Sequence, residues 1–198
     1  ADGSGETAFL TRGPFAQAFS WTPDGRSLLA STGVAEDIVR VDLLHPTERT
    51  AILATDAGES EPMLSPDGAW LAYVSNESGR REVYVRPFPD VTKGRWVVSN
   101  DGGTSPRWRA DGRELFYRSG DRMMAVTFGG GSPPALGDPA VLFEGRFADY
   151  VFGRYYDVTP DGQRFLMIAY ATQGEADSYS IIIMEHWFEE LRRKLPVP

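Results

Sequence analysis

Four aspartates recur along the chain, each followed directly by glycine, and their repetition makes them the first candidates for a chemical role. The pairs are Asp24 and Gly25, Asp67 and Gly68, Asp111 and Gly112, and Asp161 and Gly162. Repeated carboxylates could bind a hard cation, which prefers oxygen ligands. None of the four lies in an Asp-x-Asp-x-Asp-Gly loop, so the pattern favours Asx-turns, in which the carboxylate accepts hydrogen bonds from the local backbone. We therefore predict no metal site at these positions.

Other catalytic patterns are missing from the sequence. There is no cysteine, and the two histidines, His45 and His186, fall in a polar turn and beside Trp187, where surface or packing roles are expected. A Gly-x-Ser-x-Gly elbow and the protein-kinase motifs are absent. The glycine-rich stretch 129–134 lacks the Gly-Lys-Ser/Thr ending of a phosphate loop and is typical of a connection between strands. We expect no catalytic activity in this chain and no cofactor.

Charge and hydropathy exclude two further classes of partner. The chain has 28 acidic and 20 basic residues, for a net charge of −8, and no stripe of Lys and Arg. Nucleic-acid binding, which needs clustered cations, is therefore disfavoured. The longest apolar run, around Ile181 to Met184, is far short of the roughly 20 residues of a membrane span.

The start of the sequence, "ADGSGETAF", lacks the features of a signal peptide. We interpret it as a cut inside a longer protein or as a mature end.

The elements that position the four aspartates follow from a repeat. Its copies are "FSWTPDGRSLLAS", "PMLSPDGAWLAYVS", "PRWRADGRELFYRS" and "YDVTPDGQRFLMIA", whose aspartates are 43, 44 and 50 residues apart. Each copy predicts strand, type I turn and strand, because Pro presets φ and Gly accepts positive φ. Further β-rich runs follow each hairpin. Repeated four-stranded antiparallel units predict an all-β fold, a β-propeller with about four blades.

The expected blades cover residues 14–57, 58–101, 102–147 and 148–184 of a single domain, and a short amphipathic helix is expected over 185–195. Two positions of the repeat carry large apolar side chains, for which we predict packing between neighbouring blades. The first position holds Trp21, Leu64, Trp108 and Val158, and the second holds Leu28, Leu71, Leu115 and Phe165. The helix is expected to cap the last blade by burying Trp187.

These motifs, together with "VSNESGRREVYVRPFP" and the closing "WFEEL", resemble the C-terminal propeller of bacterial receptor-type serine/threonine protein kinases. That region belongs to the TolB-like class of six-bladed propellers. The resemblance extends over nearly the whole chain and implies a sensory, ligand-binding region on the extracytoplasmic side, preceded by a membrane span and a cytoplasmic kinase domain. Two features depart from the pattern. Ala110 replaces the turn proline, and the chain is short of six blades by roughly a blade and a half.

The shortfall leaves three arrangements open, namely an open arc, a ring with fewer blades, or association with a second copy. A protein or small-molecule ligand is expected where the first strand of each blade begins, around the central channel. Candidate binding residues there, and in the aromatic and basic segment 146–157, are Gln17, Glu61, Ser105, Arg146, Arg154 and Tyr155. Two rival interpretations are a propeller that accompanies a peptidase or lyase and a periplasmic scaffold resembling TolB.

Overall fold

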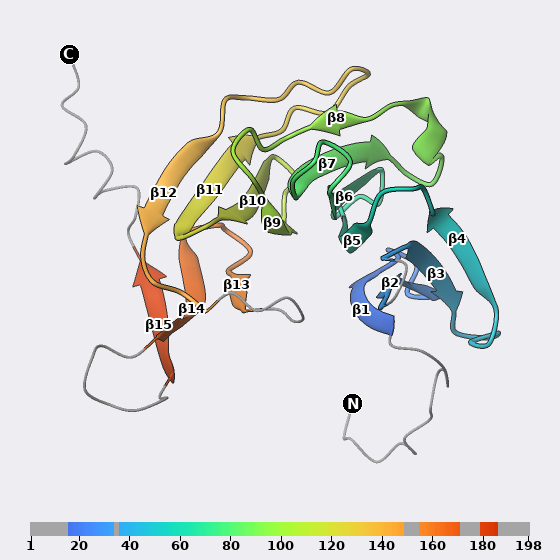
Figure 1. Cartoon of the computed structure of the whole chain (residues 1–198), viewed down its shortest axis with the longest axis horizontal. Helices are drawn as coiled ribbons and strands as arrows, with labels where there is room; N and C mark the ends of the chain where they lie inside the picture. Colours follow the sequence, from blue (N-terminus) through green and yellow to red (C-terminus); the bar gives the residue numbers. More distant parts are fainter. Residues whose placement is uncertain (1–15, 34–35, 149–154, 171–178, 186–198) are drawn as a thin grey trace.

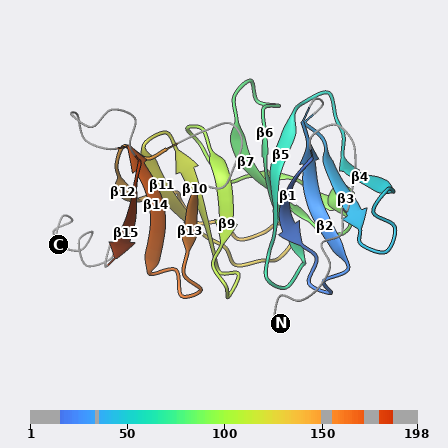
Figure 2. The ribbon, with the colours of Figure 1, turned by 90° about the horizontal axis from the view of Figure 1, so that it is seen from below.

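The computed structural model describes residues 16–33, 36–148, 155–170 and 179–185, and these residues form four antiparallel sheets arranged along an open arc (Figure 1). The all-β, four-bladed propeller predicted from the repeat is therefore confirmed. Strands that follow one another in the sequence are neighbours in each sheet. The first strand of each blade lies on the inner side of the arc, and Figure 2 shows these four inner strands side by side.

The first three blades have four described strands each, and the fourth has three. Blade 1 contains β1 (Ala16–Trp21), β2 (Ser27–Thr32), β3 (Ile38–Asp42) and β4 (Arg49–Leu53). Blade 2 contains β5 (Glu59–Leu64), β6 (Trp70–Ser75), β7 (Glu82–Pro87) and β8 (Trp96–Val97). Blade 3 contains β9 (Thr104–Trp108), β10 (Glu114–Ser119), β11 (Arg122–Thr127) and β12 (Ala140–Glu144). Blade 4 contains β13 (Tyr156–Val158), β14 (Arg164–Tyr170) and β15 (Tyr179–Glu185).

The turns between the first two strands of the blades share one hydrogen-bonding pattern. In all four, the aspartate accepts a hydrogen bond at 3.0 Å from the backbone N–H two residues later, which is an Asx-turn. The adjacent glycine has a φ between 67° and 71°. In three turns a Ser or Thr hydroxyl also donates to the carboxylate and lowers its pKa; the aspartates are Asp24, Asp67 and Asp161. Each aspartate carboxylate thus finds hydrogen-bond donors within its own turn.

The turn proline and glycine also connect one blade to the next. A Cβ atom added to Gly68 would lie 2.5 Å from Cγ of Pro23, so the proline of the first turn rests against the glycine of the second. Pro66 stands in the same relation to Gly112, at 3.6 Å. In the third turn Ala110 replaces the proline, and its N–H donates to the Pro160 carbonyl of blade 4 at 3.3 Å. The recurring turn residues therefore make contacts between blades as well as within them.

The core consists of apolar layers between successive blades. Both faces of the middle strands are covered, so β6 and β10 are buried along almost their whole length. Leu64 and Leu71 pack against blade 1, Trp108 and Leu115 pack against blade 2, and Phe165 and Val158 pack against blade 3. The Trp108 indole N–H also donates to the Met63 carbonyl across the blade junction, at 3.1 Å.

Trp21 corrects the packing prediction made for its position of the repeat. Its side chain is 56% exposed, whereas Leu64 and Trp108 at the same position are 6% and 8% exposed. At each later junction this residue packs against the preceding blade. Within the described residues no blade precedes the first one, so Trp21 has no such partner surface.

Little of the described chain is helical. A single 3-10 turn, Val91–Lys93, follows β7, and the described residues include no helix that is long and apolar enough to cross a membrane. The helix expected over 185–195 lies outside the described residues except for Glu185. That residue ends β15 instead, where it pairs with Arg164 across the sheet.

Candidate functional site

Two of the predicted binding residues, Glu61 and Ser105, share an unusual backbone conformation. Their φ values are 55° and 56°, in the left-handed region that residues other than Gly, Asn and Asp rarely adopt. Both precede a proline, and both lie where the pairing of an inner strand with its neighbour shifts register, as at a β-bulge. Such strain of about 1–3 kcal/mol persists only where surrounding contacts hold it. The two bulges, and the contacts around them, therefore fix the positions of Glu61 and Ser105.

The Glu61 carboxylate links blade 2 to blade 3. One oxygen accepts from the Arg81 guanidinium at 2.7 Å, and the other accepts from the Ser105 backbone N–H at 2.5 Å. The Glu61 side chain is only 14% exposed. Burial raises the pKa of this carboxyl group, while Arg81 and the Ser105 N–H oppose that rise. The structure thus brings Glu61 and Ser105 together, but in a contact between blades.

The same line of contacts continues into blade 4. The Tyr156 hydroxyl donates to the Ser105 carbonyl at 2.7 Å, and burial raises the pKa of the Tyr156 hydroxyl well above its usual range. Arg107, which is 5% exposed, lies against the Tyr156 ring with its guanidinium carbon 5.8 Å from the ring centroid. Arg118 of β10 is 3% exposed and donates to the Gly120 carbonyl at 2.7 Å. Two buried arginines, Arg107 and Arg118, therefore lie near the Tyr156 hydroxyl.

The remaining predicted binding residues are not brought together by the described structure. Gln17 lies on β1 opposite Ser31. Arg146 is exposed after β12, and Tyr155 is partly buried just before β13. Arg154 lies outside the described residues. In the surrounding aromatic segment, Phe147 and Tyr156 belong to the buried layer between blades 3 and 4, together with Phe165.

The raised pKa of Glu61 predicts a pH dependence of stability with a definite sign. A carboxyl group whose pKa is higher in the folded state contributes most below the unfolded pKa, and its contribution declines as pH rises through the folded pKa. The unfolding free energy of the wild type minus that of Glu61→Gln is therefore expected to fall as pH rises from below 4.5, the ordinary value. Urea unfolding at a series of pH values measures this difference.

Asp67→Asn is the matched control because the pKa of Asp67 is lowered, chiefly by the Ser65 hydroxyl. A lowered carboxyl pKa stabilises the fold above the unfolded value, and that stability is lost as pH falls. For this variant the difference from wild type must therefore rise with pH. A Glu61 difference that is flat, or that rises like that of Asp67, would contradict the burial argument.

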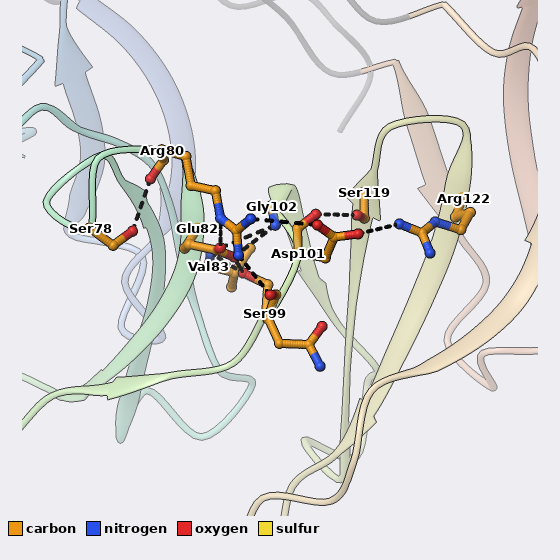
Figure 3. A network of polar contacts seen from close by, with 10 residues as sticks. Ser78, Arg80, Glu82, Val83, Ser99, Asp101, Gly102, Ser119 and Arg122 are labelled. Carbon is orange, nitrogen blue, oxygen red and sulfur yellow. Dashed lines mark hydrogen bonds and ion pairs between the residues drawn. The ribbon is translucent and has the colours of Figure 1, made fainter.

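A second polar network connects blade 2 with blade 3 (Figure 3). Its centre is Glu82, whose side chain is 4% exposed. The Glu82 carboxylate accepts from Nε of Arg80, from the Ser99 hydroxyl and from the Gly102 N–H, the last at 3.1 Å to each oxygen. The Ser99 oxygen in turn accepts from the Val83 N–H at 2.8 Å. This buried carboxylate therefore holds the β8–β9 connection against β7.

Asp101 extends the network to blade 3. Its carboxylate forms ion pairs with Arg122 at 2.9 Å and with Arg80 at 3.5 Å. Its backbone carbonyl accepts a hydrogen bond from the Ser119 hydroxyl at 2.9 Å (Figure 3). Arg80 also donates to the Asn100 carbonyl at 2.7 Å. Arg80 therefore has three acceptors, one two residues away at Glu82 and two at Asn100 and Asp101, 20 and 21 residues away.

An open groove with a volume of about 980 Å³ runs along this network. Its lining residues are Glu77, Ser78, Gly79, Arg80, Glu82, Tyr84, Arg95, Val97, Ser99 and Asn100. The side chains of Arg80 and Arg95 are 54% and 48% exposed. Arg95 pairs with Glu77 and lies over the Tyr84 ring, 5.8 Å from its centroid. Two ordered guanidinium groups thus border a solvent-open hollow.

The Ser78 hydroxyl of the groove is engaged in a local hydrogen bond. The Ser78 hydroxyl donates to the Arg80 carbonyl, at 3.2 Å, and no histidine lines the groove to serve as its base. His45 is exposed in the loop between β3 and β4. Among the described residues there is also no group of three His, Cys, Asp or Glu side chains that could hold a metal ion.

The sequence does not predict the groove, because the residues that line it do not recur at equivalent positions of the repeat. Ser78, Arg80 and Tyr84 lie in "VSNESGRREVYVRPFP", the least generic motif of the chain, which could have drawn attention to them. Arg95 precedes β8 and Asn100 follows it, and neither carries such a signal. Only folding brings the two segments to one hollow.

The fold places this chain in the class of β-propellers, and comparison with known proteins agrees. No protein-family model matches the chain, and no curated protein matches it. Solved structures do: TolB from Acinetobacter baumannii has a TM-score of 0.61 at 17% identity, over 88% of this chain and 41% of that one.

Two further structures show how widely the fold is used. A chain of a Nidogen/Laminin complex matches with a TM-score of 0.63 and 15% identity, over 92% of this chain and 65% of that one. A puromycin-hydrolyzing peptidase from Mycobacterium tuberculosis matches with a TM-score of 0.63 and 20% identity, over 86% and 30%. This chain therefore spans less than two thirds of each of these proteins, and the similarity is one of fold.

Proposed function

We propose that this chain is a non-catalytic propeller module that binds a protein ligand, and that it serves as the sensory region of a bacterial receptor-type serine/threonine kinase. The observation that carries the binding role is the groove bordered by Arg80 and Arg95. Both guanidinium groups are held by ion pairs and remain about half exposed. A ligand therefore meets a polar surface that is already ordered, which reduces the entropy lost on binding.

Arginine and tyrosine are the side chains expected at such a site. They are enriched in the hot spots of protein interfaces, and the groove offers Arg80, Arg95 and the Tyr84 ring. Guanidinium groups pair best with carboxylates, so the favoured ligand is an extended protein segment that carries Asp or Glu. One structure of similar fold comes from a protein–protein complex, which is consistent with a protein ligand.

The kinase association rests on the motifs of the sequence. "VSNESGRREVYVRPFP" supplies both the resemblance to the kinase propellers and one wall of the groove. In such a protein the module lies on the extracytoplasmic side, where it meets ligands from outside the cytoplasm. The coding region upstream of this chain tests this part: kinase motifs followed by a membrane span support it, and a hydrolase domain in the same polypeptide contradicts it.

Binding itself can be measured with an array of synthetic peptides that vary in acidic content. The wild type is expected to retain acidic peptides, and Arg80→Ala/Arg95→Ala is expected to weaken that binding about tenfold or more. Arg26→Ala removes an exposed arginine in the first turn of blade 1, outside the groove, and should leave binding unchanged. Equal losses in both variants, or no preference for acidic peptides, would contradict the assignment of the groove.

A further inference from the structure

A hollow of about 480 Å³ lies between the turns of blades 2 and 3, and it shares no lining residue with the groove at Arg80. The two turns form two of its walls. Pro66 of the first turn packs against Gly112 of the second, 3.6 Å from a Cβ atom placed there. Gly129 and Gly130, in the connection between β11 and β12, line the hollow without side chains. Its volume is in the range of pockets that bind small molecules.

The apolar part of the lining is aromatic and fixed by packing. Trp70 and Phe128 line the hollow, with their ring centroids 5.1 Å apart in an edge-to-face contact. Trp96 packs against Trp70 at 5.9 Å, and Trp108 packs against Phe128 at 4.8 Å. Phe128 is buried and Trp70 is partly exposed. The rings are therefore held in place by one another, and they offer a preformed apolar surface to a ligand.

Two charged side chains of the hollow form no ion pair with any described residue. The first is Asp67, whose Oδ1 accepts hydrogen bonds within its own turn, and the Ser65 hydroxyl lowers the pKa of this carboxyl group. The second is Arg113, which is exposed on the other turn. Asp111 also lines the hollow but pairs with Arg109 at 3.6 Å. The hollow therefore presents one uncompensated negative group and one uncompensated positive group.

This combination is specific to the junction of blades 2 and 3. At the positions of Trp70 and Arg113, the junction of blades 1 and 2 has Ser27 and Ala69, and the junction of blades 3 and 4 has Glu114 and Gln163. Ala110, which replaces the turn proline of the other repeats, also lines the hollow, as does the glycine-rich stretch that begins at Gly129. The features that depart from the repeat thus gather at one place, and the packing of the blades does not require them.

We propose that this hollow binds a free α-amino acid with a large apolar side chain. Asp67 accepts hydrogen bonds from the α-ammonium group, Arg113 donates to the α-carboxylate, and the apolar side chain lies against Trp70 and Phe128. Carboxylates pair with ammonium groups, and guanidinium groups pair with carboxylates through two parallel hydrogen bonds. A ligand with a charge of only one sign would leave Asp67 or Arg113 without a partner. The proposal is independent of the groove at Arg80 and Arg95.

NMR titration with free phenylalanine, leucine and methionine tests the proposal, and binding is expected at millimolar concentrations. Asp67→Asn keeps an Asx-turn, because an amide oxygen accepts the same hydrogen bonds. This variant and Arg113→Gln are each expected to weaken binding about three- to tenfold. Asp24→Asn and Arg26→Gln change the same two turn positions in blade 1, outside the hollow, and should leave binding unchanged. Circular dichroism of each variant confirms the fold.

Capped ligands assign each charged group to its partner. Phenylalanine amide lacks the carboxylate, so it should bind more weakly than phenylalanine, and Arg113→Gln should weaken it no further. N-acetyl-phenylalanine lacks the ammonium group, and its weaker binding should be insensitive to Asp67→Asn. The proposal would be overturned if none of the three amino acids bound, if the capped ligands bound as tightly as phenylalanine, or if the blade 1 variants lost as much affinity as Asp67→Asn and Arg113→Gln.

Discussion

Gly68→Val is expected to lower the free energy of unfolding by about 2–5 kcal/mol, from backbone strain and steric overlap together. Gly68 has a φ of 69°, a region in which a β-branched residue is strained. A Cβ atom there would also lie 2.5 Å from Cγ of Pro23, which belongs to the turn of the neighbouring blade. Urea denaturation followed by circular dichroism measures the loss.

Gly25→Val separates the two causes. Gly25 has nearly the same φ, 67°, but a Cβ atom added to it would meet no atom within 4 Å. Its variant should therefore show only the strain, about 1–2 kcal/mol. The assignment of the Pro23–Gly68 contact between blades would be wrong if the two variants lost the same stability.

Glu82→Ala is the second substitution with a large expected effect, a loss of about 2–4 kcal/mol. The carboxylate is almost fully buried, and its removal leaves the Ser99 hydroxyl and the Gly102 N–H without their acceptor. The half-exposed Arg80 contributes less, because solvent screens its ion pair. Because Glu82 joins β7 to the connection that leads into blade 3, a coupled loss of order at Asn100 to Gly102 is expected in hydrogen exchange.

Two controls bracket this result. Glu82→Gln keeps one acceptor oxygen and the shape of the side chain, so its loss of stability should be smaller than that of Glu82→Ala. Glu48→Ala removes an exposed carboxylate of blade 1 and should change stability by no more than about 0.5 kcal/mol. An effect of Glu82→Ala as small as that of Glu48→Ala would show that the buried network contributes little.

The fold could be predicted well because the same strand–turn–strand motif occurs four times in the sequence. Asp and Gly at fixed spacing define each hairpin, and apolar runs such as "LAYV" in β6 indicate strands buried on both faces. The interaction of each turn is complete within a few residues, as the Asx-turn at Asp67 shows. The packing prediction for Trp21 is wrong, because a repeat position indicates which surface a residue presents, but not whether another blade covers that surface.

The candidate site could be predicted only in part. Alignment on the turns singled out Glu61 and Ser105, and the structure joins them, but as a contact between blades that also depends on Arg81 and Tyr156. The groove depends on Arg80 and Arg95, which are held in place by Glu82 and Glu77. These pairings connect segments that the repeat does not relate to one another.

Residues near one another in the sequence thus specify the hairpins, the four sheets and the propeller class, because turn geometry and strand alternation are local properties. The tertiary arrangement alone decides which buried charges meet, where the groove opens, and which blade faces remain uncovered. Ion pairs such as Arg122 with Asp101, and the exposure of Trp21 compared with the burial of Trp108, depend on how the blades are placed around the arc. The packing of side chains between blades determines which residues of different blades meet, and the spacing of residues along the chain does not predict it.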